Sequence, residues 1–421
     1  MLIVRHDLKL GFYSGARRYI SGAVAFLLLT VSAASAQDWV TLPTLSVVGA
    51  YETNPNLEPG AGDSNTTYRI NPSIISRLEL PTSAVELSGS VTFTRSRNET
   101  VQEDSEQYRF GGSYEKDFET SVASVDADVS FEEFANSEFD DDQALSAVDA
   151  TQSNEDDTIL SNKLRFQLNN ELSETDALTS SLDLTHTEFS DEARTDFADI
   201  RGDARLDHDY SETTTLSAVL GLQYFDPAGE TAVKVLRGAG GYAYEFGDNH
   251  SLSILGGLAI SSDRTSFTAD ASYFQPFKDF DFAASVSNDV QADDDGELNE
   301  TARADFVVTN PISEFTNLQT SLGLTKTETT NAILLNSLLS YDYSDTLRTS
   351  FSASYRYSEN VGGENKTETT QVVLAPSVTW TVYEELDAIF RYDEINERDQ
   401  DDQRANSRRG TLTLNYNLPP L

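Results

Sequence analysis

Polar and apolar side chains alternate, residue by residue, through most of the chain. Between Ile200 and Tyr210 the even positions are Ile, Gly, Ala, Leu, His and Tyr, whereas every odd position is Arg or Asp. The same two-residue period recurs at 85–94, 125–131 and 347–358. Because successive side chains of a β-strand point to opposite faces, each segment predicts a strand with one apolar and one polar face. We find no comparable stretch with the 3.6-residue period of an amphipathic helix.

About twenty such segments follow one another, and the connections between them alternate in length. The predicted strands start near residues 42, 67, 85, 106, 122, 158, 177, 197, 215, 232, 251, 265, 280, 300, 317, 331, 347, 370, 385 and 409. Short connections lie at 80–84, 172–176, 246–250 and 343–346, and longer, more acidic ones lie at 53–66, 136–156, 291–299, 359–368 and 396–407. Short turns on one rim and long loops on the other are typical of outer-membrane barrels, and an even strand number places both chain ends on the periplasmic side.

Nearly every segment has one polar face, which favours a membrane barrel over a soluble sandwich. A closed ring of such strands faces lipid outside and water inside, and closure satisfies every backbone donor and acceptor. The sequence therefore predicts an all-β fold, a transmembrane antiparallel up-and-down β-barrel of about 20 strands, with 18–22 as the range. A soluble β-solenoid or an extracellular adhesin is the structural alternative.

Aromatic, proline and glycine residues add local expectations. Aromatic side chains near the ends of the apolar faces predict girdles at the two membrane interfaces, although β-propensity alone would also place them in strands. They are Tyr108, Phe110, Tyr114, Tyr242, Tyr244, Phe246, Tyr341, Tyr343, Tyr355, Tyr357 and Trp380. Pro72 and Pro376 each remove one ladder donor, so we expect bulges or strand starts there. The glycines at 238, 240 and 241 predict a bend or a bulge within a strand.

The first 36 residues have the features of a secretory signal peptide. A basic segment that ends at Arg18 precedes a short apolar run at 22–31, and Ala34-Ser-Ala36 supplies a small-residue cleavage pattern. The apolar run is too short to span a bilayer as a helix, which disfavours the alternative of a membrane anchor. We therefore divide the chain into a signal peptide (1–36) and an outer-membrane barrel (37–421).

The charge balance excludes several classes of protein. The 421 residues hold 70 acidic and 29 basic side chains, a formal charge of −41, and removal of residues 1–36 changes this to −44. Such a chain does not suit nucleic acid, which requires a basic surface. The absence of Cys excludes disulfides and thiolate chemistry. Acidic loops beside anionic lipopolysaccharide need divalent cations or high salt, which gives the hypothesis of a salt-adapted bacterium. Folding and function unchanged in low-salt medium without divalent ions would count against it.

Candidate chemistry is concentrated on the polar faces. An EF-hand reading of 291–302 fails, because Gln291 and Ala302 stand where carboxylates are required. No local motif indicates a nucleophile, a metal site or a cofactor, so we expect none. The predicted inward-facing side chains are Arg109, Asp126, Asp128, Lys163, Arg165, Asp183, Arg201, Asp203, Arg205, Asp207, Arg348, Arg356, Asp387, Arg391 and Asp393. Interleaved charges of this kind either form ion-pair ladders that stiffen the wall or contact a polar solute. For solute contact we select Arg201, Asp203, Arg205, Asp207, Arg348 and Arg356.

The start of the mature chain resembles a family of outer-membrane β-barrel porins often found with exopolysaccharide biosynthesis and export clusters. The matching segments are Tyr-Glu-Thr-Asn-Pro-Asn at 51–56 and Tyr-Arg-Ile-Asn-Pro-Ser-Ile at 68–74, separated by an acidic gap. The resemblance implies an exit path for an exported polysaccharide. The C-terminus departs from the aromatic ending common in outer-membrane proteins, since the chain closes on Leu418-Pro-Pro-Leu421.

Three functional hypotheses follow. The first is a channel in the Gram-negative outer membrane, for polysaccharide export or passive diffusion of small polar solutes. The second is a structural or adhesive barrel with a blocked lumen and acidic, cation-binding loops. The third is a lipid-modifying enzyme, which the sequence disfavours. The expected partners are outer-membrane lipid, lipopolysaccharide and the barrel-assembly machinery.

Overall fold

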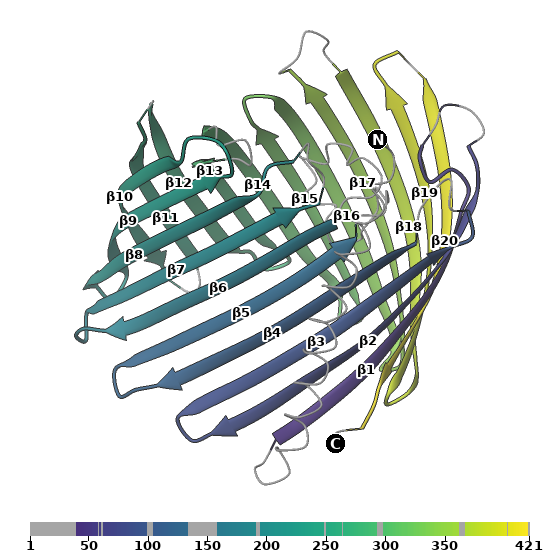
Figure 1. Ribbon diagram of the computed structural model, residues 1–421, viewed down its shortest axis with the longest axis horizontal. Helices are drawn as coiled ribbons and strands as arrows, with labels where there is room; N and C mark the ends of the chain where they lie inside the picture. Colours follow the sequence, from purple (N-terminus) through teal and green to yellow (C-terminus); the bar gives the residue numbers. More distant parts are fainter. Residues whose placement is uncertain are drawn as a thin grey trace, which may run out of the picture.

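The computed structural model describes residues 39–419 except 58, 60–61, 99–103, 134–157, 191–193, 248–249, 263, 293–297, 362–366 and 402. The described chain is a single 20-stranded antiparallel sheet (Figure 1). Its strands are β1 (Trp39–Glu52), β2 (Asn65–Leu80), β3 (Ser83–Ser96), β4 (Ser105–Asp117), β5 (Ser121–Glu133), β6 (Thr158–Glu171), β7 (Asp176–Phe189), β8 (Phe197–Ser211), β9 (Thr214–Pro227), β10 (Val233–Phe246), β11 (His250–Ile260), β12 (Thr265–Pro276), β13 (Asp281–Ala292), β14 (Leu298–Ser313), β15 (Thr316–Lys326), β16 (Thr330–Ser344), β17 (Leu347–Asn360), β18 (Thr367–Tyr383), β19 (Leu386–Asp399) and β20 (Arg404–Asn417).

The sheet closes on itself. Each strand pairs with the next along the chain, and β1 also pairs with β20, from Thr44 opposite Asn417 to Glu52 opposite Arg409. Every even-numbered strand is joined to the following odd-numbered one by only two to four residues, whereas the connections at the other rim span three to 24 residues. These features confirm the predicted all-β, up-and-down barrel. The proposed signal peptide, residues 1–36, and the acidic connection 136–156 lie outside the described residues.

Strand positions agree closely with the alternation. Every strand except the last begins within three residues of its predicted start, and β20 begins at Arg404 rather than 409. The predicted long connection at 396–407 is wrong, because β19 reaches Asp399 and the loop shortens to 400–403. The ladder continues there through the polar pairs Asn396–Asn406 and Arg398–Arg404. Backbone pairing does not require an apolar face, so strands extend beyond the membrane-facing part of the wall.

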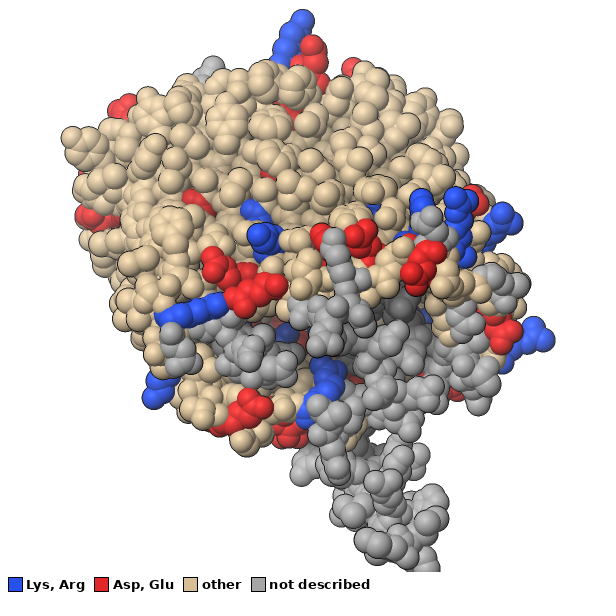
Figure 2. Space-filling model, turned by 90° about the horizontal axis from the view of Figure 1, so that it is seen from above, with Lys and Arg blue, Asp and Glu red and all other residues tan. Residues whose placement is uncertain are grey.

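The outer wall is apolar. Side chains of one parity along the strands form an exposed apolar set, as Leu216, Leu220 and Leu222 do on β9. Figure 2 shows a broad surface with few charged side chains, whereas Lys, Arg, Asp and Glu gather near its lower border in that view. A surface of this kind cannot face water over such an area without a membrane or a partner to cover it.

Aromatic side chains mark the short-turn rim, as the girdle hypothesis expects. Trp380, Tyr343 and Phe246 lie close to the short turns with exposed side chains, and Tyr341 contacts Tyr343 edge-on. Exposed apolar or aromatic residues next to these turns are Leu80, Phe118, Leu172, Tyr210, Phe246, Phe277, Phe315, Tyr343 and Tyr383. Rings at this level suit a membrane–water interface.

The two strand prolines depart from the expectation of bulges or strand starts. Pro72 lies inside β2 and Pro376 inside β18. Pairing of β2 with β3 breaks between Ile70 and Ser73 and then resumes in the same register, and β18 behaves likewise against β19. Each proline therefore removes a local pair of ladder contacts without inserting a residue, so the predicted bulges are wrong.

A glycine-rich corner joins β10 and β11. The register runs without a shift through Gly238, Gly240 and Gly241, which excludes a bulge. A Cβ on Gly241 would lie 2.1 Å from the carbonyl oxygen of Ile254, and one on Gly257 would lie 2.3 Å from that of Gly238. Glycine is required where two backbones approach this closely on the inner face of a sharply curved wall.

A charge on the lipid-facing wall should destabilise the barrel. Replacing Leu220, which is exposed halfway along β9, with arginine is expected to cost about 2–4 kcal/mol, the range for cationic side chains at the bilayer midplane. Urea titration of the barrel in lipid vesicles measures this cost. The control is Val219→Arg, whose side chain has the opposite parity and faces the lumen, where little loss of stability is expected.

Candidate functional site: the lumen wall

Charged side chains of both signs line the inner face, where most arginines are held by carboxylates. The described ion pairs include Arg109–Asp128, Arg165–Asp183, Arg205–Asp207, Arg348–Asp342 and Arg391–Asp393. Most of these pairs join adjacent strands or residues two apart on one strand. The arrangement matches the ion-pair ladder that the sequence left open as one alternative to solute contact.

The six candidate residues do not form one site. Arg201, Asp203, Arg205 and Asp207 lie on β8, whereas Arg348 and Arg356 lie on β17. Since β8 and β17 are nine strands apart in a ring of 20, these two groups stand on opposite walls. The structure thus places the six candidate residues in two separate groups. Their role in solute contact stays a prediction.

The individual contacts of these residues differ. Arg205 Nε donates to both carboxylate oxygens of Asp207 at 2.9 Å, and Arg205 Nη2 donates to Ser217 Oγ at 3.0 Å. Arg348 donates to Asp342 near the short-turn rim. Arg356 lies opposite Gln371, which in turn lies opposite Glu397 and donates to it at 3.3 Å. Asp203 lies opposite Gly221, whose missing side chain leaves room for the carboxylate.

One hairpin leaves the wall near its loop end. Pairing of β13 with β12 ends at Asn288, although β12 continues to Thr265. On the other side, Ala302 of β14 pairs with Lys326, where β15 ends. Above these points, 289–292 and 298–301 pair only with each other. We call these eight residues the ribbon. Asn288 marks the departure point, because its amide donates to Phe267 O at 2.7 Å and to Glu300 Oε1 at 2.8 Å.

The ribbon turns into the barrel and packs against the inner face of other strands. Val290 is 1% exposed and packs in one cluster with Val235 of β10 and Ala259 of β11, each 2% exposed. The residues that flank these two along the strands, such as Leu236 and Leu258, are exposed on the outer wall, so Val235 and Ala259 face inward. The connections on either side of the displaced hairpin meet through an ion pair between Arg264 and Glu328.

Six side chains form a closed cycle of hydrogen bonds between the ribbon and the wall. On the wall, Arg201 Nε donates to Asp199 Oδ2 at 2.6 Å, and Gln223 Nε2 donates to Asp199 Oδ1 at 3.1 Å. Arg237 Nη2 donates to Gln223 Oε1 at 3.4 Å. Together with Asp289 and Gln291 of β13, these four wall residues form a cycle that we call the lumen ring.

Two hydrogen bonds join the wall side of the lumen ring to the ribbon. Arg201 Nη1 donates to Gln291 Oε1 at 3.0 Å, and Arg237 Nη1 donates to Asp289 Oδ1 at 3.3 Å. Gln291 Nε2 donates to Asp289 Oδ2 at 2.5 Å and closes the cycle. The ring joins β8, β9 and β10 to β13, and its two arginines balance its two aspartates. It therefore holds the ribbon inside the barrel without leaving a net charge there.

A second segment covers the inner face at the closing seam. Leu57, from the connection after β1, is buried against Ile395 and Ala405, with Val373 beside them. Below it lies a buried polar cluster in which Asp393 accepts from Arg391 Nε at 2.7 Å and from Arg409 Nε at 3.4 Å. Charges buried this deeply require such pairing.

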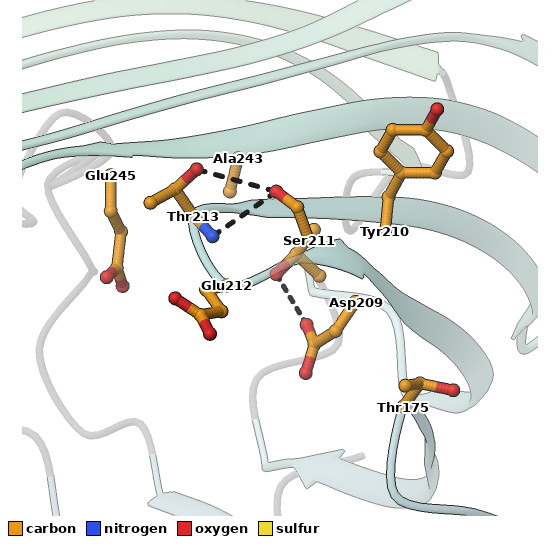
Figure 3. Close-up of a pocket in the computed structure, with 9 residues that line it drawn as sticks. Thr175, Asp209, Tyr210, Ser211, Glu212, Thr213, Ala243 and Glu245 are labelled. Carbon is orange, nitrogen blue, oxygen red and sulfur yellow. Dashed lines mark hydrogen bonds between the residues drawn. The ribbon is translucent and has the colours of Figure 1, made fainter.

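The structure also shows a depression at the short-turn end of the inner face. Its lining includes Asp209 of β8, Glu212 of the β8–β9 turn and Glu245 near the end of β10, and no basic side chain (Figure 3). Thr215 Oγ1 donates to Asp209 at 2.7 Å.

Sequence reasoning missed most of the lumen ring. It selected Arg201 alone among the six members and assigned Gln291 to a loop. The sequence did contain one indication of these residues. Asp289 and Gln291 occupy alternate positions that continue the inward-facing side of β13. Among the described residues, no group of three or more His, Asp or Glu is placed to hold a metal ion, and no helix is long and apolar enough to cross a membrane.

Comparison with solved structures shows a barrel fold similar to those of siderophore and ferric-catecholate receptors. No protein-family model and no curated protein sequence matches the chain. The ferric-catecholate import receptor Fiu from Escherichia coli K12 matches with a TM-score of 0.59 and 9% identity, over 90% of this chain and 82% of that one. The siderophore receptor PirA from Acinetobacter baumannii matches with a TM-score of 0.58 and 9% identity, over 90% and 80% of the two chains. At this identity the likeness concerns the fold alone.

Proposed function

We propose that the protein is a channel of the Gram-negative outer membrane that admits small polar solutes by diffusion. The observation that carries this proposal is the closed 20-stranded wall, apolar outside and lined inside with paired charges. Barrels of about 16–18 strands leave an aqueous channel, and this ring is larger. Residues 1–36 would direct export, and the outer leaflet would be the lipopolysaccharide layer.

Two narrower readings have weaker support. Export of a polysaccharide rests only on the resemblance at 51–74. An adhesive barrel rests on the acidic connections, most of which lie outside the described residues. The substrates of the similar receptors are not transferred to this chain, because the likeness is one of fold.

Recordings in planar lipid bilayers test the channel. The purified, folded protein should produce discrete conductance steps, since water and ions fill a wide polar bore, whereas heat-denatured protein should produce none. Absence of steps from folded protein, in the wild type and in the ribbon variants below, would contradict the channel. Deletion of residues 136–156 distinguishes the adhesive barrel from the channel. If the protein is an adhesin, the deletion should abolish surface attachment and leave conductance unchanged.

A further inference from the structure

The ribbon loses backbone pairing that the rest of the wall has, because β13 leaves β12 at Asn288 and β14 extends past the end of β15 at Lys326. Along 289–292 and 298–301 each strand keeps only one neighbour. An isolated two-stranded hairpin is marginally stable at best. Two kinds of contact compensate for the missing backbone pairing. Val290 packs against Val235 and Ala259, and the wall arginines Arg201 and Arg237 donate hydrogen bonds to the ribbon.

These contacts all lie on the inner face of β8 to β11. Arg201 is on β8, five strands before β13, and Arg237 is on β10, three strands before it. A hairpin that leaves β12 and packs on the inner face of β10 and β11 occupies part of the bore. The ribbon therefore narrows the lumen.

We propose that the ribbon is the selectivity constriction of the channel and that the lumen ring, through Arg201, Arg237, Asp289 and Gln291, holds it inside the bore. This inference rests on the proposed function. Asn288 is the hinge, because the hairpin leaves β12 at that residue. When the ring opens, the ribbon loses its polar contacts with the wall, uncovers Val235 and Ala259, and widens the path for solutes.

The first test removes the ribbon's half of the ring. The double variant Asp289→Ala, Gln291→Ala deletes both acceptors that the wall arginines use, and single-channel conductance should rise. Asp305→Ala is the matched control, because Asp305 is a lumen-facing carboxylate of the same hairpin that lies below the departure point. It removes the same charge without touching the ring, and its conductance should stay close to that of the wild type.

A reversible lock separates movement of the ribbon from a change of charge. The chain has no cysteine, so Val290→Cys with Ala259→Cys introduces the only two thiols, at positions that pack together. In the double-alanine background, oxidation should return conductance to the wild-type value and reductant should raise it again. The control pair is Ser253→Cys with Ser272→Cys, which faces the lumen on the adjacent strands β11 and β12 and should change nothing.

A readout independent of conductance uses a thiol placed beneath the ribbon. Val235→Cys should react slowly with a water-soluble thiol reagent in the wild-type background, because Val235 is 2% exposed. Loss of the ring should speed labelling about tenfold, which corresponds to roughly 1.4 kcal/mol.

The outcomes are distinguishable. Unchanged conductance and unchanged labelling in the double-alanine variant would overturn the constriction while leaving the channel intact. Faster labelling without any current from any variant would support a movable ribbon and contradict the channel.

Discussion

Replacing Gly241 with alanine is expected to prevent the barrel from folding. The new Cβ would lie 2.1 Å from Ile254 O and 2.8 Å from Leu255 Cα. Both atoms belong to the backbone of β11, which is fixed by its ladders to β10 and β12, so no side-chain rotation relieves the clash. Overpacking against mobile side chains typically costs 1–3 kcal/mol, and we expect more than about 3 kcal/mol here. Heat-modifiable migration in SDS electrophoresis reports the folded fraction directly.

The control lies three residues earlier on the same strand. Gly238 has no atom within 4 Å of the position that its Cβ would occupy, so Gly238→Ala should fold as the wild type does. Equal folded fractions for the two variants would show that β10 and β11 separate easily, and would contradict the tight corner inferred from the glycines.

The sequence predicts the wall of this molecule well, because the period of two is a local property. The alternation of Arg and Asp with Ile, Ala and Leu along β8 is visible without knowledge of any neighbour. Strand ends are less certain for a physical reason. The segment 404–408 has no continuous apolar face, yet it pairs with β19 because backbone hydrogen bonds form regardless of side-chain polarity.

The lumen ring could not be predicted in the same way. Gln291 contacts Arg201 across 90 positions of sequence, and the contact depends on where β13 leaves β12. That departure is a property of the assembled sheet, since the alternation on β13 continues through Asp289 and Gln291 without interruption. The sequence shows that both residues face inward, but it does not show which wall they reach.

The polar contacts of the lumen differ in burial, and burial decides which of them contribute to stability. Arg348 and Asp342 are more than two-fifths exposed, with side-chain values of 63% and 42%, so water screens their attraction. The side chains of Asp393 and Arg409 are 2% and 12% exposed. The seam between β1 and β20 encloses this second pair, with Ser407 donating to Glu52 beside it at 2.9 Å.

Replacing Asp393 with asparagine should therefore destabilise the barrel strongly. The substitution keeps the shape of the side chain but removes the negative charge that Arg391 and Arg409 share. Neutralising one member of a buried ion pair costs about 3–5 kcal/mol, and the carboxylate of Glu52, which lies opposite Arg409, places the expected loss at the lower end of that range. The same change at Asp342, which faces Arg348 in water, should cost less than about 1 kcal/mol. Urea titrations of both variants in lipid vesicles measure the difference. Equal losses of stability in the two variants would mean that water reaches the seam. The pairing of β1 with β20 would then depend on backbone hydrogen bonds and not on the ion pairs of Asp393.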